Sequence, residues 1–239
     1  LVSLEQARAN RFAADWKAHV TVKPKFIGRK LLKNYDLAEL AQYLDWSPFF
    51  QTWDLTGSYP KILEDKVVGE SARNVFRDAQ AMLKKIIEGR WLTANGVFVL
   101  WPANSVGDDI EIYADESRSK TLMTWHNLRQ QNEKAADRAN LCLADFVASK
   151  DSGIADYVGA FAVTAGIGVD ERVKAYEAKH DDYNAIMLKS LADRLAEAFA
   201  ERLHQRVRRE FWGYAADETL DNNALIAEKY RGTRPAPGY

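Results

Sequence analysis

The stretch YNAIMLKSLADRLAEAFAERLHQRVRREF, residues 183–211, decides the fold class of this 239-residue chain. Its large apolar side chains recur every three or four residues, which is the spacing of one face of an α-helix. They are Leu188, Leu191, Leu195, Phe199, Leu203, Val207 and Phe211. The spacing predicts one long helix with a continuous buried stripe.

Upstream of this helix, the middle of the chain has the character of β-strands. Five short runs are rich in apolar, β-branched and aromatic residues, which favour a half-buried pleated surface. They span 97–101, 110–113, 122–125, 141–147 and 158–163, and residues 104–109 predict a hairpin loop between the first two. Helices, then strands, then helices, without βαβ alternation, predict an α+β fold with a central, mainly antiparallel twisted sheet flanked by long helices.

Capping signals and apolar periodicity place the other helices. Ser3 with Gln6, and Asp36 with Glu39, form the reciprocal pattern of capping boxes. Gly89 is expected to follow a helix as its C′ residue. The expected helices span about 4–16, 37–43, 70–88, 171–179 and 223–230.

A short turn at Asp45 separates two helical segments. Ser47 followed by Pro48 has the pattern of an N-cap and a first-turn proline. Because Asp45 lies in this turn between two helices, its side chain can point into a cleft. Trp46 is a candidate to line the same cleft, although the seven tryptophans are most simply residues of the core and its rim.

Composition limits the class of protein. With a formal net charge of −1, the chain has no overall charge that would attract it to nucleic acid or to a membrane. Its apolar runs are too short to span a bilayer. The single cysteine, Cys142, excludes an internal disulfide, and its apolar neighbours predict a core residue rather than a nucleophile. No secretory signal pattern is present, so we expect a cytoplasmic protein.

The long helix carries an acidic row beside its apolar stripe. Asp193, Glu197 and Glu201 are spaced four residues apart, and like charges at this spacing cost roughly 0.2–0.5 kcal/mol per pair. Arg194 and Arg202 are near enough to compensate in part. Taken alone, the row predicts a solvated acidic face.

Two other patterns are weaker. Gly166 and Gly168 mimic the start of a dinucleotide fingerprint, but position 171 is Glu and the βαβ context is absent. The run His-Asp-Asp at 180–182 could suggest a metal site, but adjacent residues in a helical turn point apart. An acidic cluster at the start of a helix is therefore favoured. We therefore assign no metal site and no catalytic Ser/His/Asp arrangement.

The last six residues, RPAPGY at 234–239, form a stiff, extended segment. Its prolines fix their own φ and bias the preceding residues away from helix. Arg234 is suited to forked recognition of a planar carboxylate. On composition alone, a proline-rich tail that merely leaves the domain is the simpler interpretation.

The tail also resembles the S-adenosylmethionine-binding loop of the C-terminal activation domain of cobalamin-dependent methionine synthases. Further matching segments run in family order from near residue 35. They are 44–50 (LDWSPFF), 101–104 (WPAN), 106–113 (VGDDIEIY), 128–131 (LRQQ), 142–147 (CLADFV), 180–184 (HDDYN) and 191–198 (LADRLAEA). The resemblance implies one C-shaped activation domain over residues 1–239, with an antiparallel sheet at its centre.

The resemblance implies a reactivation module. In it, S-adenosylmethionine supplies the methyl group for reductive remethylation of cob(II)alamin, and flavodoxin or an equivalent reductase supplies an electron. Cobalamin is then carried by a neighbouring domain of the same polypeptide, and zinc only by a separate domain. The domain contributes positioning, so no catalytic side chain is expected.

The resemblance also implies a binding site for S-adenosylmethionine. The implied residues are Asp45, Glu197, Arg234, Ala236, Gly238 and Tyr239. By charge, the arginine is assigned to the ligand carboxylate and the two acidic residues to its cationic groups. The backbone around the glycine approaches the ligand because it lacks a Cβ atom, and the tyrosine provides an aromatic wall.

The chain begins without methionine and ends on the Gly-Tyr of this motif, so we expect a piece that is truncated at its C-terminus. It is expected to fold, but to bind S-adenosylmethionine at least about tenfold more weakly than an extended domain whose following segment closes the site. Two alternatives stay open. One is an interaction domain that caps the cobalamin domain and docks flavodoxin, and the other is a self-contained small-molecule methyltransferase.

Overall fold

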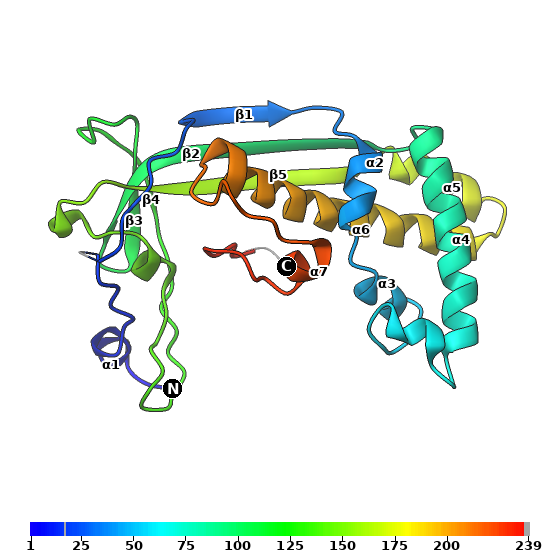
Figure 1. Ribbon diagram of the computed structural model, residues 1–239, viewed down its shortest axis with the longest axis horizontal. Coiled ribbons are helices and arrows are strands. Elements are labelled where there is room, and N and C mark those ends of the chain that lie inside the picture. The colour runs from blue at the N-terminus through cyan, green and yellow to red at the C-terminus, as the bar shows by residue number, and fades with distance from the viewer. Residues whose placement is uncertain (17, 237–239) are drawn as a thin grey trace. The chain divides into compact units, whose positions relative to one another are not determined.

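The computed structural model describes residues 1–16 and 18–236 and confirms the predicted α+β class (Figure 1). An antiparallel sheet is flanked by helices. The helices are α1 (Leu4–Ala9), α2 (Leu37–Leu40), α3 (Ser47–Gln51), α4 (Gly69–Glu88), α5 (Val169–Glu177), α6 (Asp182–Arg206) and α7 (Asn222–Ile226). The strands are β1 (Gly28–Leu32), β2 (Thr93–Val106), β3 (Asp109–Tyr113), β4 (Thr121–Trp125) and β5 (Asp156–Ile167).

The strands form a sheet in the order β1-β2-β3-β4, and β5 pairs with β2. Strand β3 runs antiparallel to both neighbours, with Ala103 of β2 opposite Ile112. The β2–β3 hairpin turns at Gly107, whose φ of 62° lies in the left-handed region. The loop is therefore shorter than the predicted 104–109, and β2 continues to Val106.

The chain divides into two compact units. Unit 1 comprises Leu1–Lys30, Phe98–Ala160 and Arg208–Ala216, and unit 2 comprises Leu31–Val97, Phe161–Val207 and Asp217–Tyr239. The single domain over residues 1–239 stays a prediction.

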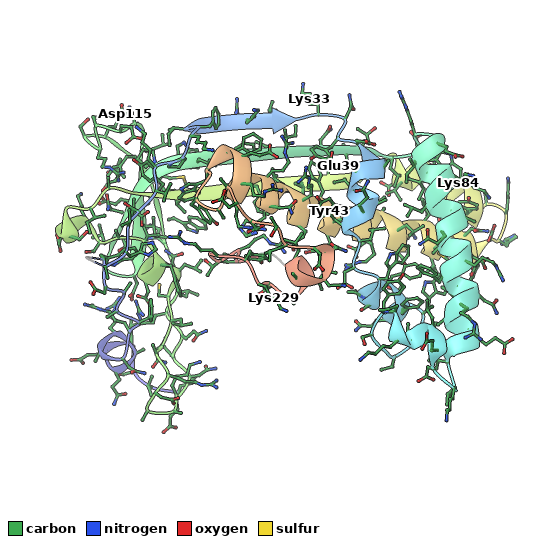
Figure 2. All side chains as sticks on the ribbon, in the orientation of Figure 1. Lys33, Glu39, Tyr43, Lys84, Asp115 and Lys229 are labelled. Atoms are coloured by element: carbon green, nitrogen blue, oxygen red, sulfur yellow. The ribbon has the colours of Figure 1, made fainter. Side chains whose placement is uncertain are left out.

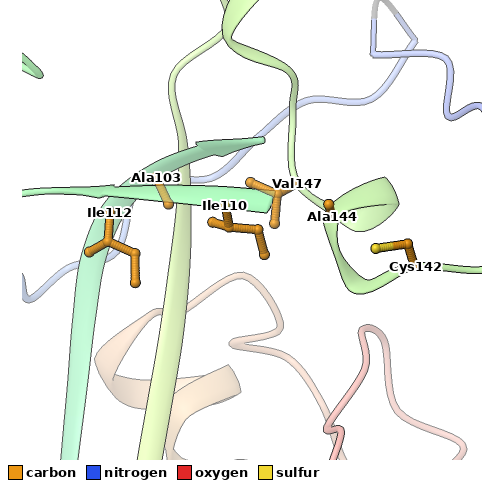
Figure 3. Packing of buried hydrophobic residues seen from close by; sticks show 6 residues of the cluster. All are labelled: Ala103, Ile110, Ile112, Cys142, Ala144 and Val147. Carbon is orange, nitrogen blue, oxygen red and sulfur yellow. The ribbon is translucent and has the colours of Figure 1, made fainter. Parts of the chain in front are cut away.

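In unit 1, β2, β3 and the segment after Asn140 enclose a small apolar core (Figure 3). Its buried members are Ala103, Ile110, Ile112, Cys142, Ala144 and Val147, and Trp101, Trp125 and Val158 pack against them. The Cys142 thiol donates to the carbonyl oxygen of Asp108 at 3.4 Å, and burial raises the pKa of this thiol. The prediction that this cysteine is a core residue is confirmed.

Unit 1 also contains a buried ion-pair cluster around Arg129, whose side chain is 1% exposed. Its Nε and Nη2 donate to Asp108 at 2.9 and 2.7 Å, and its Nη1 and Nη2 donate to Asp145 at 2.8 and 2.7 Å. Nη1 also donates to the carbonyl oxygen of Asn140 at 2.7 Å. All three guanidinium nitrogens of this Arg129 cluster are satisfied.

The strand predicted over 141–147 is wrong, because a 3-10 helix occupies Leu143–Phe146. The Asp145 carboxylate accepts from the backbone N–H of Cys142 at 2.9 Å. This local hydrogen bond competes with a strand ladder and curls the chain.

Unit 2 is organised by α6, the predicted long helix. The apolar stripe is buried where predicted, at Leu188, Leu191, Leu195, Phe199 and Leu203. A Cβ atom on Gly96 of β2 would lie 2.9 Å from the Phe199 ring, so the strand passes closer to the helix than alanine would allow. The end of the predicted stripe, Val207–Phe211, is a π-helical turn rather than regular helix.

Several helix ends differ from the prediction. Helix α1 has the predicted capping box, but it stops at Ala9 instead of extending to Trp16. The side chain of Asn10 donates instead to the carbonyl of Arg138 and to Asn140, which fixes the chain in a tertiary contact.

At the end of α4, Gly89 has an ordinary φ of −83°, so the predicted C′ role is wrong. Arg90 takes the left-handed conformation instead, with a φ of 47°. Glycine is still needed at position 89, because a Cβ atom there would lie 2.5 Å from the Trp91 indole nitrogen. Sequence analysis also missed β1, since the run GRKLL is exposed along its centre and shows no alternation.

Candidate functional site

The predicted site residues that the structure describes all belong to unit 2. Asp45 lies in the expected turn, between the 3-10 helix Ala41–Tyr43 and α3. Its Oδ1 accepts from the backbone N–H of Ser47 at 2.9 Å, so this carboxylate caps the start of α3. The predicted N-cap at Ser47 is wrong: Trp46 is the N-cap, and the Ser47 hydroxyl accepts from the backbone N–H of Tyr59.

The segment before Asp45, which carries Glu39 and Tyr43 (Figure 2), is attached to α6 by polar contacts. Arg202 donates through Nε to Glu39 at 2.6 Å, and the hydroxyl of Tyr43 lies 3.1 Å from Oε1 of Gln205. The capping box predicted for Asp36 with Glu39 is therefore incomplete. Asp36 accepts from the backbone N–H of Ala38, but the Glu39 carboxylate is turned toward α6.

The acidic row of α6 is not uniformly solvated. Asp193 is 70% exposed and pairs with Arg194, as a surface residue does. Glu197 is 34% exposed, whereas the side chain of Glu201 is only 9% exposed. The predicted solvated face is therefore wrong at Glu201, and Arg202 pairs with Glu39 rather than with this row.

Arg234 lies against this buried part of the row. Its Nη2 donates to Oε2 of Glu201 at 2.9 Å, and its Nη1 lies 3.7 Å from Oε1 of Glu197. Burial lowers the pKa of the Arg234 guanidinium, but the Glu201 carboxylate, Tyr230 and Glu197 outweigh it and raise the pKa above its ordinary value. We call these three charged residues the Arg234 cluster.

Two further contacts attach the C-terminal segment to unit 2. The ring of Tyr230 meets the ring of His204 edge to face, with centroids 4.8 Å apart. Asn222, the first residue of α7, donates through Nδ2 to the carbonyl oxygen of Leu44 at 3.2 Å. The second contact places α7 beside the backbone that leads into Asp45.

Some buried polar atoms at this site have no hydrogen-bond partner among the residues that the structure describes. They include Nε of Arg234, which is a donor, and Oδ1 of Asn222, which is an acceptor. The Asn222 amide cannot simply be flipped, because the Leu44 carbonyl requires a donor at the position of Nδ2. A ligand with a carboxylate and an N–H or O–H group would satisfy both atoms.

The structure thus brings Glu197 and Arg234 together and places Asp45 on the neighbouring segment. Ala236 is exposed at the end of the described tail. The predicted binding residues Gly238 and Tyr239 lie outside the described residues. Trp46 is buried and packs edge to face on Phe49 and Phe76, as the simpler prediction of a core tryptophan requires.

Sequence analysis missed Glu201 and Asn222. Glu201 had a usable signal, because it follows Glu197 by one helical turn and lies next to positions of the apolar stripe. Asn222 had none, since it is separated from Leu44 by 178 positions.

The weaker patterns have structural explanations. Asp181 caps α6 by accepting from the backbone N–H of Asn184, as a helix-starting cluster would. Gly168 is the N-cap of α5, with a left-handed φ of 98°. Among residues 1–16 and 18–236, no cluster of three or more His, Cys, Asp or Glu side chains is arranged to hold a metal ion. Within the same ranges, no helix has the length and apolar content needed to cross a bilayer.

Comparisons with known proteins identify relatives of this chain. A family model described as "Vitamin B12 dependent methionine synthase, activation domain" matches residues 36–239. A solved structure, described as the crystal structure of the MetH reactivation domain bound to AdoHcy, is 55% identical in sequence and superposes with a TM-score of 0.95. The match covers 100% of this chain and 73% of that chain.

Proposed function

This chain belongs to the activation-domain family of vitamin B12-dependent methionine synthases, and we propose that it binds S-adenosylmethionine as the methyl donor for reductive remethylation of cob(II)alamin. The similar reactivation domain was solved with AdoHcy, the product that S-adenosylmethionine becomes when it loses its methyl group. That complex is the single observation that most directly supports this ligand class.

The charges of the site suit this ligand. S-adenosylmethionine carries a carboxylate, an ammonium and a sulfonium, so its net charge is positive. The Arg234 cluster has one positive and two negative side chains, and Asp45 on the neighbouring segment adds a further carboxylate. We assign the ligand carboxylate to Arg234 and its cationic groups to Asp45 and Glu197, because each pairing brings opposite charges together.

The unsatisfied atoms of Arg234 and Asn222 support the same assignment. The Nε of Arg234 requires an acceptor, which a ligand carboxylate provides, and the guanidinium can then donate two parallel hydrogen bonds. The Oδ1 of Asn222 requires a donor, which the ammonium, the ribose or the adenine amine provides. The tail residues Ala236, Gly238 and Tyr239 complete the proposed site through backbone contacts and an aromatic wall.

The chemistry asked of these residues is positioning. The S–CH3 bond breaks, and the methyl group is transferred without the bonding electron pair. That pair stays on sulfur, so the sulfonium becomes a neutral thioether. Cobalamin, when bound to its own domain, supplies the nucleophile, and one electron comes from a reductase that we propose to be flavodoxin or its equivalent. No proton has to move, so holding the ligand by its carboxylate and amine meets the demand.

The protein partners follow from the family. A vitamin B12-dependent methionine synthase has a cobalamin domain in the same polypeptide, and we propose this domain as the surface that the bound methyl donor faces. The identity of the reductase is a separate proposal that rests on the resemblance alone.

Calorimetric titration of this chain with S-adenosylmethionine tests the proposal, with Asn222→Ala and Asn223→Ala as a matched pair. Asn223 is the exposed neighbour of Asn222. Loss of one hydrogen bond predicts an affinity about two- to tenfold lower in Asn222→Ala, since such a bond contributes about 0.5–1.5 kcal/mol. The Asn223→Ala variant should bind normally. A chain that binds flavodoxin and the cobalamin domain but not the methyl donor would instead be a capping and docking domain.

A further inference from the structure

Glu201 is a buried carboxylate on α6, a helix that also buries the polar side chains of Ser190, His204 and Gln205. It lies one turn beyond Glu197, and its side chain is 9% exposed. A buried charge is costly unless it has a charged or hydrogen-bonding partner. The Nη2 of Arg234, 2.9 Å from Oε2, is such a partner.

The contact helps to fix the Arg234 guanidinium, which also has a side-chain hydrogen bond with Tyr230. Arginine has a long, flexible side chain, and this one comes from an extended tail rather than from a helix or strand. The partner carboxylate lies on α6, whose residues are fixed by the buried stripe. The hydrogen bond engages Nη2 and leaves Nε without a partner among residues 1–16 and 18–236.

Resting on the proposed function, we propose that Glu201 is a positioning residue, which holds the Arg234 guanidinium so that its Nε edge receives the carboxylate of S-adenosylmethionine. Glu201 does not touch the ligand in this arrangement. Its effect on binding is transmitted through Arg234 and therefore through the ligand carboxylate alone.

The test uses the whole 239-residue chain and two ligands, S-adenosylmethionine and its decarboxylated analogue, which keeps the sulfonium and the amine. Glu201→Gln keeps an oxygen that can accept from Nη2 but removes the charge, and Glu201→Ala removes both. Asp193→Asn is the matched control, because Asp193 is an exposed carboxylate on the same helix. Circular dichroism melting of each variant checks that it is folded.

We expect Glu201→Ala to lower the affinity for S-adenosylmethionine about tenfold, the order expected when a charged hydrogen bond that fixes a binding group is lost. Glu201→Gln should retain part of the affinity, and Asp193→Asn should change it less than twofold. Affinity for the decarboxylated analogue should stay within twofold in every variant. In an Arg234→Ala background, Glu201→Ala should have no further effect.

Three results would overturn the inference. Equal losses for both ligands would make Glu201 a general support of the fold. An unchanged affinity would remove it from the site, and a higher affinity would mean that it competes with the ligand for Arg234. The proposed function fails differently: the unaltered chain would then not bind S-adenosylmethionine at all.

Discussion

The Arg129 cluster of unit 1 and the Arg234 cluster of unit 2 have the same composition, one arginine and two carboxylates. They differ in completeness. Every guanidinium nitrogen of Arg129 donates to a protein oxygen, and its side chain is 1% exposed. Arg234 is 14% exposed, its distance to Glu197 is 3.7 Å, and its buried Nε has no partner in the described parts of the chain.

We interpret the difference as one between a structural ion pair and a proposed ligand-binding ion pair. A buried arginine whose donors are all satisfied has no donor left for a ligand, and removing it takes the common partner away from two carboxylates. An arginine with an unsatisfied donor can still donate one hydrogen bond to a ligand. Similar residue types therefore have separate roles, and substitution should reveal each role in a different measurement.

The largest effect is expected for Arg129→Met. This variant leaves Asp108 and Asp145 buried without their common partner, which should cost about 3–5 kcal/mol of unfolding free energy. For a chain of this size, that corresponds to a melting temperature about 6–20 °C lower. Differential scanning calorimetry measures it, with Arg234→Met as the comparison. If Arg234→Met melts as low as Arg129→Met, the distinction between the clusters is lost.

The next effect is expected in binding. Arg234→Ala should lose about 2–5 kcal/mol of binding free energy for S-adenosylmethionine, because one partner of a desolvated charge pair is removed. Arg234→Lys should recover only part of it, since an ammonium cannot donate two parallel hydrogen bonds to a carboxylate. Calorimetric titration gives both values. An unchanged affinity in Arg234→Ala would contradict the assignment of the ligand carboxylate.

A smaller effect is expected at Asp45, which has a capping role and a proposed ligand role. Asp45→Asn keeps an oxygen for the Ser47 N–H, so the melting temperature should barely change while affinity falls. Asp45→Ala should also lose the cap, at a cost of about 1 kcal/mol of stability. Parallel melting and titration of the two variants separate the roles. A destabilised Asp45→Asn with normal affinity would leave only the capping role.

The smallest effect is expected in the pH dependence of the stability that the Arg129 cluster provides. Burial raises the pKa of Asp108, but hydrogen bonds from Arg8 and Arg129 outweigh it and hold the pKa below its ordinary value. The stabilisation from the Asp108 carboxylate is therefore present above its unfolded-state pKa of about 3.9. It is lost as the pH falls through the folded-state pKa. The stability difference between the unaltered chain and Asp108→Asn should be largest at pH 7 and shrink below about pH 4. Urea titrations across this range measure it, and a difference that grows on acidification would reverse the sign we assign.

The fold was predictable where local pattern and tertiary packing agree. The stripe of α6 is such a case, because its period of 3.6 residues is visible in the sequence and its burial follows. Prediction failed at 141–147, where an apolar run looks like a strand and one aspartate hydrogen bond curls it into a 3-10 helix. It failed again at β1, whose exposed side chains leave no alternation to detect.

The candidate site was predictable only in part. Asp45, Glu197 and Arg234 are predicted from family resemblance and not from any spacing that indicates a ligand. The burial of Glu201 and the contact from Asn222 to Leu44 depend on how the tail returns to α6, and no local rule carries that information. Only the folded chain shows which of several acidic residues meets the arginine.

The hydrogen bond between Asn222 and Leu44 closes a loop of 178 residues, so the site assembles only after most of the chain is in place. Most side chains between Asn223 and Pro235 are exposed, with Leu225 as a buried exception. Such a segment undocks at a lower free-energy cost than α6, and its amide protons should exchange with solvent first. The proposed methyl-donor site would then be the first part of unit 2 to open, and ligand binding would slow that exchange.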